Sequence, residues 1–262
     1  MKKLVLLAAL LSTLGAGVAQ AQLIPDISTY IANAAGQSAS VGPASRIDLL
    51  YDTDSYTPPF YRGRALASAG TIMHFTAIPH FAGAGGAAIP TSSITFTWKI
   101  DGRVEGEVSG KGAASVALPS PTLYGRNTIE VDANAGGGVY GSASITIAAL
   151  DPEPMLYEDH PLYGIEYYNA LGTQTTVPDI EMTFAAIPFF AQAGSASDAS
   201  LTYQWSVNGQ TVAATSSNEN EITINASNSN GLAALAVSLS SRVNAFLAGH
   251  GTWNILFSRA GQ

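Results

Sequence analysis

The sequence contains no cysteine among its 262 residues. This absence excludes disulfides, cysteine-ligated zinc and a thiol nucleophile. The stability of the fold therefore has to come from burial of apolar side chains. A chain of this length can bury enough of them to form one large domain or two ordinary domains.

Charged side chains are also scarce. They make up 11% of the residues, against roughly 25% in an average globular protein. The formal net charge is −8, and it becomes −10 once Lys2 and Lys3 at the start of the chain are left out. An acidic surface repels phosphate groups, so we expect no nucleic-acid partner and no binding to anionic membranes.

A secretion signal occupies residues 1–21. Two lysines precede the apolar segment Leu4–Val18, and Ala19-Gln20-Ala21 has the pattern that a signal peptidase recognises. The apolar segment is short for a membrane span, and no cysteine follows it to carry a lipid anchor. We predict cleavage after Ala21, with a retained anchor as the alternative. The cleaved chain is expected outside the cytoplasm, either secreted, periplasmic or at the cell surface, and not inserted in a membrane.

An internal repeat organises the rest of the chain. The block "LLYDTDSYTPPFYRGRAL" at 49–66 returns as "MLYEDHPLYGIEYYNAL" at 155–171. Likewise, "MHFTAIPHFAGAG" at 73–85 returns as "MTFAAIPFFAQAG" at 182–194. The repeating unit is about a hundred residues long, which is the length of an independent domain.

These blocks predict one domain at 49–150 and a second at 155–262. Between them, the prolines of "LDPEP" predict a short, stiff linker at 151–154. Residues 22–48 form an N-terminal extension. Within it "LIPDISTYIANAA" is either a short helix, from its apolar spacing, or an irregular segment.

Apolar side chains recur at every second residue within each unit. The segments "ITFTWKIDG" and "LTYQWSVNG" place Trp98 and Trp205 on the apolar face of a strand, and each ends in an Asp-Gly or Asn-Gly hairpin turn. About seven short strands per unit predict an all-β chain of two tandem immunoglobulin-like β-sandwiches. We therefore expect Trp98 and Trp205 to be structural core residues, with exposed platforms for sugar rings as the alternative.

The strand motifs "TFTWKIDG" and "TYQWSVNG" resemble the tandem Ig-like and PKD-like repeats of bacterial secreted and cell-surface proteins. "LYEDHPLYG" is also similar to segments of uncharacterised exported proteins from small bacteria. The resemblance covers most of residues 49–262, without the "GDG" turn of PKD repeats or the cysteine pair of antibody domains. It implies a spacer, adhesive or assembly role without catalysis, and it transfers no catalytic residues.

One carboxylate-rich cluster has a similar position in both units. Its members are Asp52, Asp54, Glu158, Asp159 and His160. Oxygen ligands at alternate positions suit Ca²⁺. The fuller calcium-loop signature is missing, so we favour solvated loop acids over a calcium site and expect no other cofactor.

Catalytic motifs are not found. The sequence contains no GxSxG and no HExxH, and the histidines do not recur between the units: His74 corresponds to Thr183 and His80 to Phe189. We predict no catalytic residue and no enzyme. A secreted hydrolase with paired carboxylates is the least favoured alternative.

The repeated blocks "YTPPFYRGRAL" and "YGIEYYNAL" are rich in aromatic residues. They are expected to cap the sandwiches or to seal the junction between the units. Tyrosine and arginine are also frequent at protein interfaces, so the alternative is a partner-binding surface. This alternative assigns partner contacts to Tyr61, Tyr163, Tyr167 and Tyr168.

The sequence as a whole predicts a non-catalytic exported structural, spacer or adhesion protein. A carbohydrate-binding module that uses exposed aromatic residues is the main alternative. Expected partners are other surface proteins, a glycan, or further copies of the chain, including copies that pair through sheet edges.

Overall fold

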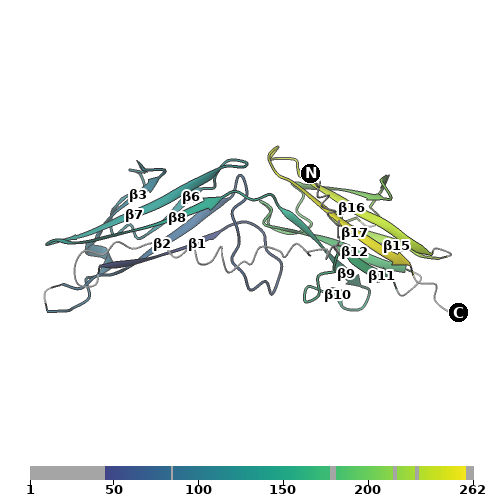
Figure 1. Ribbon diagram of the computed structural model, residues 1–262, viewed down its shortest axis with the longest axis horizontal. Helices are drawn as coiled ribbons and strands as arrows, with labels where there is room; N and C mark the ends of the chain where they lie inside the picture. The colour runs from purple at the N-terminus through teal and green to yellow at the C-terminus, as the bar shows by residue number, and fades with distance from the viewer. Residues whose placement is uncertain (1–44, 84, 178–180, 215–216, 228–229, 258–262) are drawn as a thin grey trace, which may run out of the picture. The chain divides into compact units, whose positions relative to one another are not determined.

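The structure is a computed structural model. It describes residues 45–257 except 84, 178–180, 215–216 and 228–229 (Figure 1). The predicted signal sequence and the segment "LIPDISTYIANAA" lie outside the described residues. In the part of the chain that the structure describes, no helix has the length and apolar character that a membrane span requires.

The first repeat forms two antiparallel sheets. Its strands are β1 (Arg46–Thr53), β2 (Ile72–His80), β3 (Thr95–Ile100), β4 (Arg103–Val104), β5 (Gly110–Lys111), β6 (Ser115–Pro119), β7 (Arg126–Gly136) and β8 (Val139–Ala148). A short 3-10 helix, η1 (Thr91–Ser93), precedes β3. One sheet has the order β1-β2-β6 and the other β4-β3-β7-β8, with β5 paired to β3.

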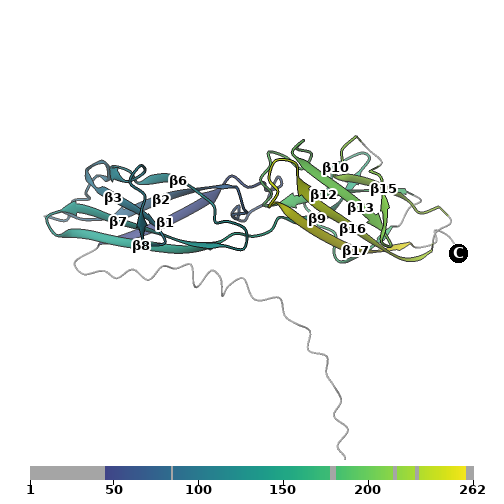
Figure 2. The same cartoon turned by 90° about the horizontal axis from the view of Figure 1, so that it is seen from above.

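The second repeat has the same main strands, with β10 and β11 added and, among the described residues, no counterpart of β5. Its strands are β9 (Glu153–His160), β10 (Gly164–Ile165), β11 (Gln174–Val177), β12 (Glu181–Phe189), β13 (Leu201–Val207), β14 (Gln210–Val212), β15 (Glu221–Asn225), β16 (Gly231–Ser241) and β17 (Ala248–Phe257). The sheets have the orders β10-β9-β12-β15 and β11-β17-β16-β13-β14, and β11 runs parallel to β17. In Figures 1 and 2 the first repeat runs from purple to teal and the second from green to yellow.

The strand order identifies both repeats as immunoglobulin-like β-sandwiches. In immunoglobulin lettering, β9, β12 and β15 are strands A, B and E, and they face G, F, C and C′, which are β17, β16, β13 and β14. The first repeat gives the same lettering. The fold class predicted from the period-two pattern is therefore confirmed.

Trp98 and Trp205 lie in the interior of their sandwiches, and both side chains are fully buried. Burial of an indole requires a partner for its N–H group. Trp98 Nε1 donates to the carbonyl of Ala113 at 2.8 Å, and Trp205 Nε1 donates to the carbonyl of Glu219 at 2.9 Å. In both repeats the buried indole N–H therefore donates to a backbone carbonyl, and neither indole is available to a ligand.

The turn after each Trp strand is built by the residues that the sequence singled out. Asp101 and Gly102 have φ values of 51° and 80°, and Asn208 and Gly209 have 50° and 77°. Two successive positive φ values define the hairpin turn that Asp-Gly and Asn-Gly favour. The Asp101 carboxylate also accepts a hydrogen bond from the Thr128 amide, which ties the turn to the neighbouring strand β7.

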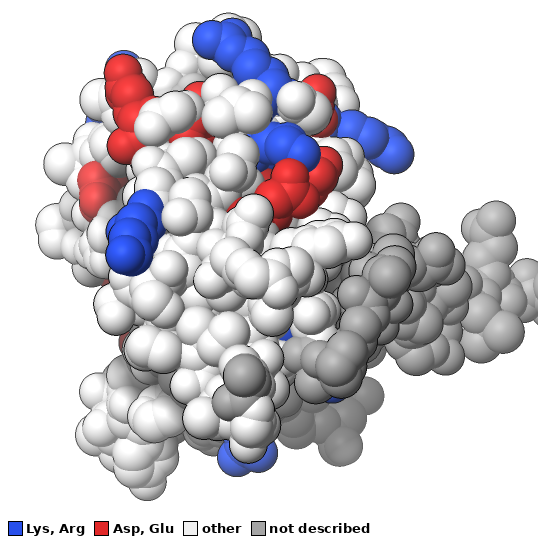
Figure 3. Space-filling view, turned by 90° about the vertical axis from the view of Figure 1, so that its left-hand side faces the viewer, with Lys and Arg blue, Asp and Glu red and all other residues white. Residues whose placement is uncertain are grey.

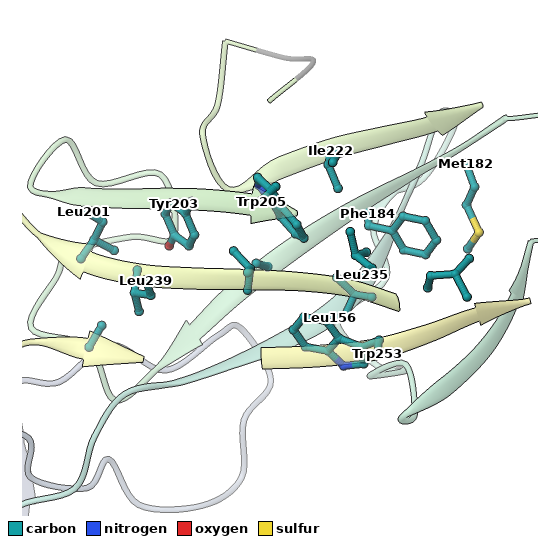
Figure 4. Packing of buried hydrophobic residues seen from close by; sticks show 14 of the residues in the cluster. Leu156, Met182, Phe184, Leu201, Tyr203, Trp205, Ile222, Leu235, Leu239 and Trp253 are labelled. Carbon is teal, nitrogen blue, oxygen red and sulfur yellow. The ribbon is translucent and has the colours of Figure 1, made fainter. Parts of the chain in front are cut away.

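Each sandwich encloses its own apolar core. The core of the second repeat includes Trp205 from β13, Phe184 from β12 and Leu235 from β16, and Figure 4 shows these side chains packed between the strands. The core of the first repeat includes Trp98 together with Phe75, the counterpart of Phe184. Shared positions in the two cores explain why the sequence repeat is visible at all.

The boundaries between the repeats differ slightly from the prediction. Strand β1 begins at Arg46, three residues before the predicted domain start, and β9 begins at Glu153. Glu153 therefore pairs with Phe189 in a sheet, although the sequence placed it in the linker. The prediction also missed β11, because "QTTV" is short and carries little apolar signal.

Candidate functional site

The candidate site lies in the segments that cross from the first strand of each sandwich to its opposite sheet. The first crossing loop is residues 54–71. It ends near a parallel bridge between Ser68 and Leu150 on the opposite sheet. The second crossing loop is residues 161–173, which contains β10 and leads into β11. These loops hold the aromatic blocks that recur in the sequence.

The first crossing loop is bound to the second repeat through the backbone of Tyr56. The Tyr56 amide donates to the carbonyl of Ala191 at 2.8 Å, and the Phe190 amide donates to the carbonyl of Tyr56 at 2.7 Å. Phe190 and Ala191 directly follow β12. This reciprocal pair fixes Tyr56 in the manner of one residue of a β-ladder.

The side chain of Tyr56 covers apolar groups on the outer face of the second repeat. It packs against a cluster that includes Tyr157, Ala185 and Ile187. Burial raises the pKa of Tyr56 to about 12, and a hydrogen bond with Tyr167 contributes to the shift. The outer face of β9 and β12 is therefore covered rather than solvated.

Two further contacts hold the first crossing loop in place. The ring of Tyr61 meets those of Phe189 and Phe190 edge to face, with centroids 5.4 and 6.0 Å apart. The Asn244 side-chain amide donates to the carbonyl of Ala69 at 2.8 Å. The loop thus contacts both the segment after β12 and the segment between β16 and β17.

The second crossing loop also carries exposed aromatic and apolar side chains, which none of the described residues covers. The exposed fractions of Tyr163 and Tyr168 are 78% and 82%, and Leu162 is similarly exposed. The Tyr163 ring stacks on His160 with centroids 4.6 Å apart, and the Leu162 amide donates to His160 Nδ1 at 3.1 Å. Tyr163 is therefore presented on the turn between β9 and β10, and Tyr168 follows β10 in the same loop.

The surroundings of these rings are acidic. A hydrogen bond to Glu166 raises the pKa of Tyr168, and the nearby Glu158 adds to the shift. Burial raises the pKa of Asp159, which also lies close to Glu221. Residues 151–262 contain ten acidic and two basic residues, so the second repeat carries most of the negative charge of the chain.

The four tyrosines predicted as partner contacts divide into two pairs. Tyr163 and Tyr168 are exposed, as a partner-binding role requires. Tyr61 packs on Phe190, and Tyr167 lies 6.0 Å from Tyr157, so these two serve contacts within the chain. Partner contact by Tyr61, Tyr163, Tyr167 and Tyr168 stays a prediction.

Tyr56, which was not among the predicted contact residues, is hydrogen-bonded to the second repeat through both its amide and its carbonyl group. A signal existed, because Tyr56 precedes Tyr163 by 107 residues and Tyr61 precedes Tyr168 by the same number. The letters of the two blocks align Tyr51 with Tyr157, one residue away from this spacing, and this offset obscured the correspondence.

The predicted calcium ligands take part in backbone hydrogen bonds. The Asp52 carboxylate accepts from the Thr53 amide and the Asp54 carboxylate from the Ile72 amide, both at 2.8 Å. Within residues 45–257, gaps aside, no three Asp, Glu or His side chains gather closely enough to hold a metal ion. Calcium binding by Asp52, Asp54, Glu158 and Asp159 stays a prediction.

A polar groove opens on the outer face of β3 and β7 in the first repeat. It has a volume of about 550 Å³ and is lined by Ser93, Thr95, Thr97, Lys111, Asp132, Asn134, Ala135 and Gly136. The Lys99 ammonium lies 2.6 Å from the Asp132 carboxylate, which raises the pKa of Lys99. Tyr140 on β8 pairs with Asn134 and is half-exposed beside the groove.

Comparisons with known proteins bear on the fold only. No protein-family model matches the chain, and no curated protein matches it. Among solved structures, murine CEACAM1b is 12% identical, with 80% of this chain and 100% of that chain covered and a TM-score of 0.27. A central fibronectin-III array of RIM-binding protein is 12% identical, with 75% and 66% covered and a TM-score of 0.24.

A third similar structure belongs to an enzyme. Red sea bream transglutaminase is 9% identical, with 83% of this chain and 32% of that chain covered and a TM-score of 0.28. At these identities and TM-scores the assignment of the sandwiches comes from their own strand order.

Proposed function

We propose that this chain is an exported, non-catalytic structural or adhesion protein whose two Ig-like sandwiches act through surface contacts. The observation that carries the proposal is the exposure of Tyr163, in the turn between β9 and β10, and of Tyr168, which follows β10 in the second crossing loop. Exposed aromatic residues rimmed by polar groups are typical of protein interaction sites.

The proposal includes a location and a domain plan. Residues 1–21 direct export, most simply in a bacterium, to the periplasm or the cell surface. Residues 49–150 and 155–262 are the two domains. The expected macromolecular partner is a surface protein or a second copy of the chain, and the net charge argues against nucleic acid.

Adhesion can be tested with the chain from Gln22 to Gln262 coupled to fluorescent beads. We expect the beads to attach to surfaces coated with extracellular proteins, and we expect Tyr163→Ser with Tyr168→Ser to reduce attachment about tenfold. The matched control is Tyr124→Ser, because Tyr124 is 83% exposed and lies in the first repeat. Attachment that is equal for all three proteins would contradict the proposal.

Carbohydrate binding is a second candidate, and the polar groove of the first repeat favours it. Asn134 and the strand threonines offer hydrogen-bonding groups, and Tyr140 offers a ring on which a sugar could stack. We expect a glycan array to show binding that Tyr140→Ala and Asn134→Ala each remove. An array without signal would leave the groove without a ligand of this class.

A further inference from the structure

We propose that the second crossing loop docks on the first repeat of a second copy of the chain, so that copies join head to tail. This inference rests on the proposed function and names the partner of its exposed site. It starts from the contact that the first crossing loop makes inside the chain.

The strand registers establish which residues of β1 and β9 are equivalent. Phe75 pairs with Tyr51, and its counterpart Phe184 pairs with Glu158. Tyr51 and Glu158 are therefore equivalent, and the spacing between them is 107 residues. The same spacing, counted on into the two loops, relates Tyr56 to Tyr163 and Tyr61 to Tyr168 in the sequence.

The related tyrosines have opposite surroundings. Tyr56 and Tyr61 are the residues through which the first crossing loop binds a neighbouring sandwich. Tyr163 and Tyr168 are held on an ordered loop and reach solvent over most of their surface. The second loop thus has the residues of a sandwich-binding loop and no sandwich bound to it among the described residues.

The first repeat offers the surface that such a loop would need. In the second repeat, the first crossing loop contacts Phe190 and Ala191 after β12 and Asn244 between β16 and β17. The segment after β2 in the first repeat begins with Phe81, which is buried in the core. The counterparts of the covered residues Tyr157 and Ile187 are Leu50 and Ile78, which are 54% and 40% exposed, so this apolar face is open among the described residues. The turn between β7 and β8 is three glycines, 136–138, and a Cβ added at any of them would meet no atom within 4 Å, so this turn is open.

The charges of the two surfaces permit this contact. The second loop is acidic through Glu158 and Glu166, whereas residues 49–150 contain seven acidic and six basic residues. Figure 3 looks onto the side of the molecule that is at the left of Figure 1, where charged side chains gather in the upper part and most of the remaining surface is uncharged. Because residues 49–150 are nearly neutral in sum, the first repeat repels an acidic aromatic loop only weakly.

A contact between different surfaces on two identical chains does not close on itself by symmetry. Head-to-tail docking therefore produces dimers first and longer chains at higher concentration. The first crossing loop is part of the same chain as the sandwich it binds, so that contact forms at an effective concentration in the millimolar range. A contact between two copies lacks this advantage, and we expect it to have a Kd between about 10 µM and 1 mM.

Sedimentation velocity on the chain from Gln22 to Gln262, at concentrations up to about 1 mM, tests the proposal. We expect the weight-average sedimentation coefficient to rise with concentration. Tyr168→Ser should raise the Kd about tenfold, whereas Tyr124→Ser, at an equally exposed tyrosine, should leave it unchanged. A chain that stays monomeric throughout, or an equal effect of both substitutions, would overturn the proposal. If the chain stays monomeric in solution but beads coated with it still attach to surfaces, this inference fails and the proposed function stands.

A mixing experiment identifies the docking surface. Gly83 can accept a side chain, because a Cβ there would lie 3.7 Å from its nearest neighbours. We expect Gly83→Glu, next to Ala82, to abolish self-association by blocking the receiving surface and repelling the acidic loop. A mixture of the Gly83→Glu and Tyr168→Ser chains retains one intact loop and one intact receiving surface, so it should form dimers and no longer species. A mixture that stays monomeric, or that forms long chains, would contradict head-to-tail docking.

Discussion

Tyr56 and Tyr163 stand 107 residues apart, in the crossing loops of the first and second repeats, yet one is held by two backbone hydrogen bonds and the other is exposed. Their cores do not explain the difference, because Trp98 and Trp205 are buried and hydrogen-bonded alike. A crossing loop can therefore contact the following sandwich, as the first one does, or be open to contacts outside the chain, as the second one is. Its sequence is compatible with both.

The outer faces of the sandwiches differ as well. In the first repeat Leu50 and Ile78 are exposed on the outer face of β1 and β2. The equivalent Tyr157 and Ile187 in the second repeat are buried beneath Tyr56 and other side chains. Docking of the loop thus removes apolar surface from water in the second repeat only, and this is the physical origin of its stabilising effect.

The largest effect is expected from the tryptophans, and it should be equal in the two repeats. Trp98→Ala and Trp205→Ala each leave a cavity in a packed core, and each should lower the free energy of unfolding of its own sandwich by about 3–5 kcal/mol. Urea denaturation followed by hydrogen exchange in each repeat measures this. A Trp variant with unchanged stability would break the claim that the cores are equivalent.

A smaller and unequal effect is expected from the loop tyrosines. Tyr56→Ala uncovers the apolar cluster around Tyr157, so it should lower the free energy of unfolding of the second repeat by about 2 kcal/mol. Tyr163→Ala is its matched control and should change the free energy by less than about 0.5 kcal/mol at low protein concentration. Equal losses would show that the two loops are in similar surroundings.

The loss of stability at alkaline pH should also differ between the repeats. The pKa of Tyr56 in the folded chain is about 12, above the value near 10 of an unfolded tyrosine. Its stabilising contribution is therefore complete below pH 10 and is lost as the pH rises from 10 towards 12. Burial also raises the pKa of Tyr157 and Tyr203, so the second repeat should lose stability in alkali more steeply.

Denaturation at pH 9 and pH 11 measures this slope in each repeat. Tyr56→Phe keeps the ring and removes the titrating group, so it should flatten the loss of stability of the second repeat. A slope that does not change in the Phe variant would assign the alkaline sensitivity to other groups.

The smallest effect is expected from calcium. Asp52 and Asp54 accept backbone hydrogen bonds, and we favour the interpretation that they are solvated loop acids. Adding Ca²⁺ to about 1 mM, the range in which extracellular calcium modules bind, should leave thermal melting unchanged in both repeats. A rise in melting temperature that Asp54→Asn removes would restore the calcium site.

The fold could be predicted because its signals are local. Alternation along "TFTWKI" sets the face of each side chain, and Asp-Gly and Asn-Gly set the turns at Asp101 and Asn208. Short strands with weak alternation, such as β11, give no such signal. The sequence therefore predicted both sandwiches but not β11, the strand at the edge of one sheet of the second repeat.

The site could be predicted only in part, because it depends on strand register. Aligning the letters of the two blocks matches Tyr51 with Tyr157. The registers match Tyr51 with Glu158 instead, one residue further along. A shift of one residue moves a side chain to the opposite face, so Tyr51 stacks on the core residue Phe75 while Tyr157 joins the outer cluster. Contacts of Tyr56 with the other repeat could not be read from local pattern at all.

Hydroxyl-radical footprinting with mass spectrometry tests the central comparison most directly, because it reads the solvent exposure of each tyrosine in one sample. Because Tyr163 and Tyr168 are exposed and Tyr56 is covered by the second repeat, we expect rapid oxidation of the first two and slow oxidation of Tyr56 at low protein concentration. Oxidation of Tyr56 at the same rate as Tyr163 would contradict this expectation.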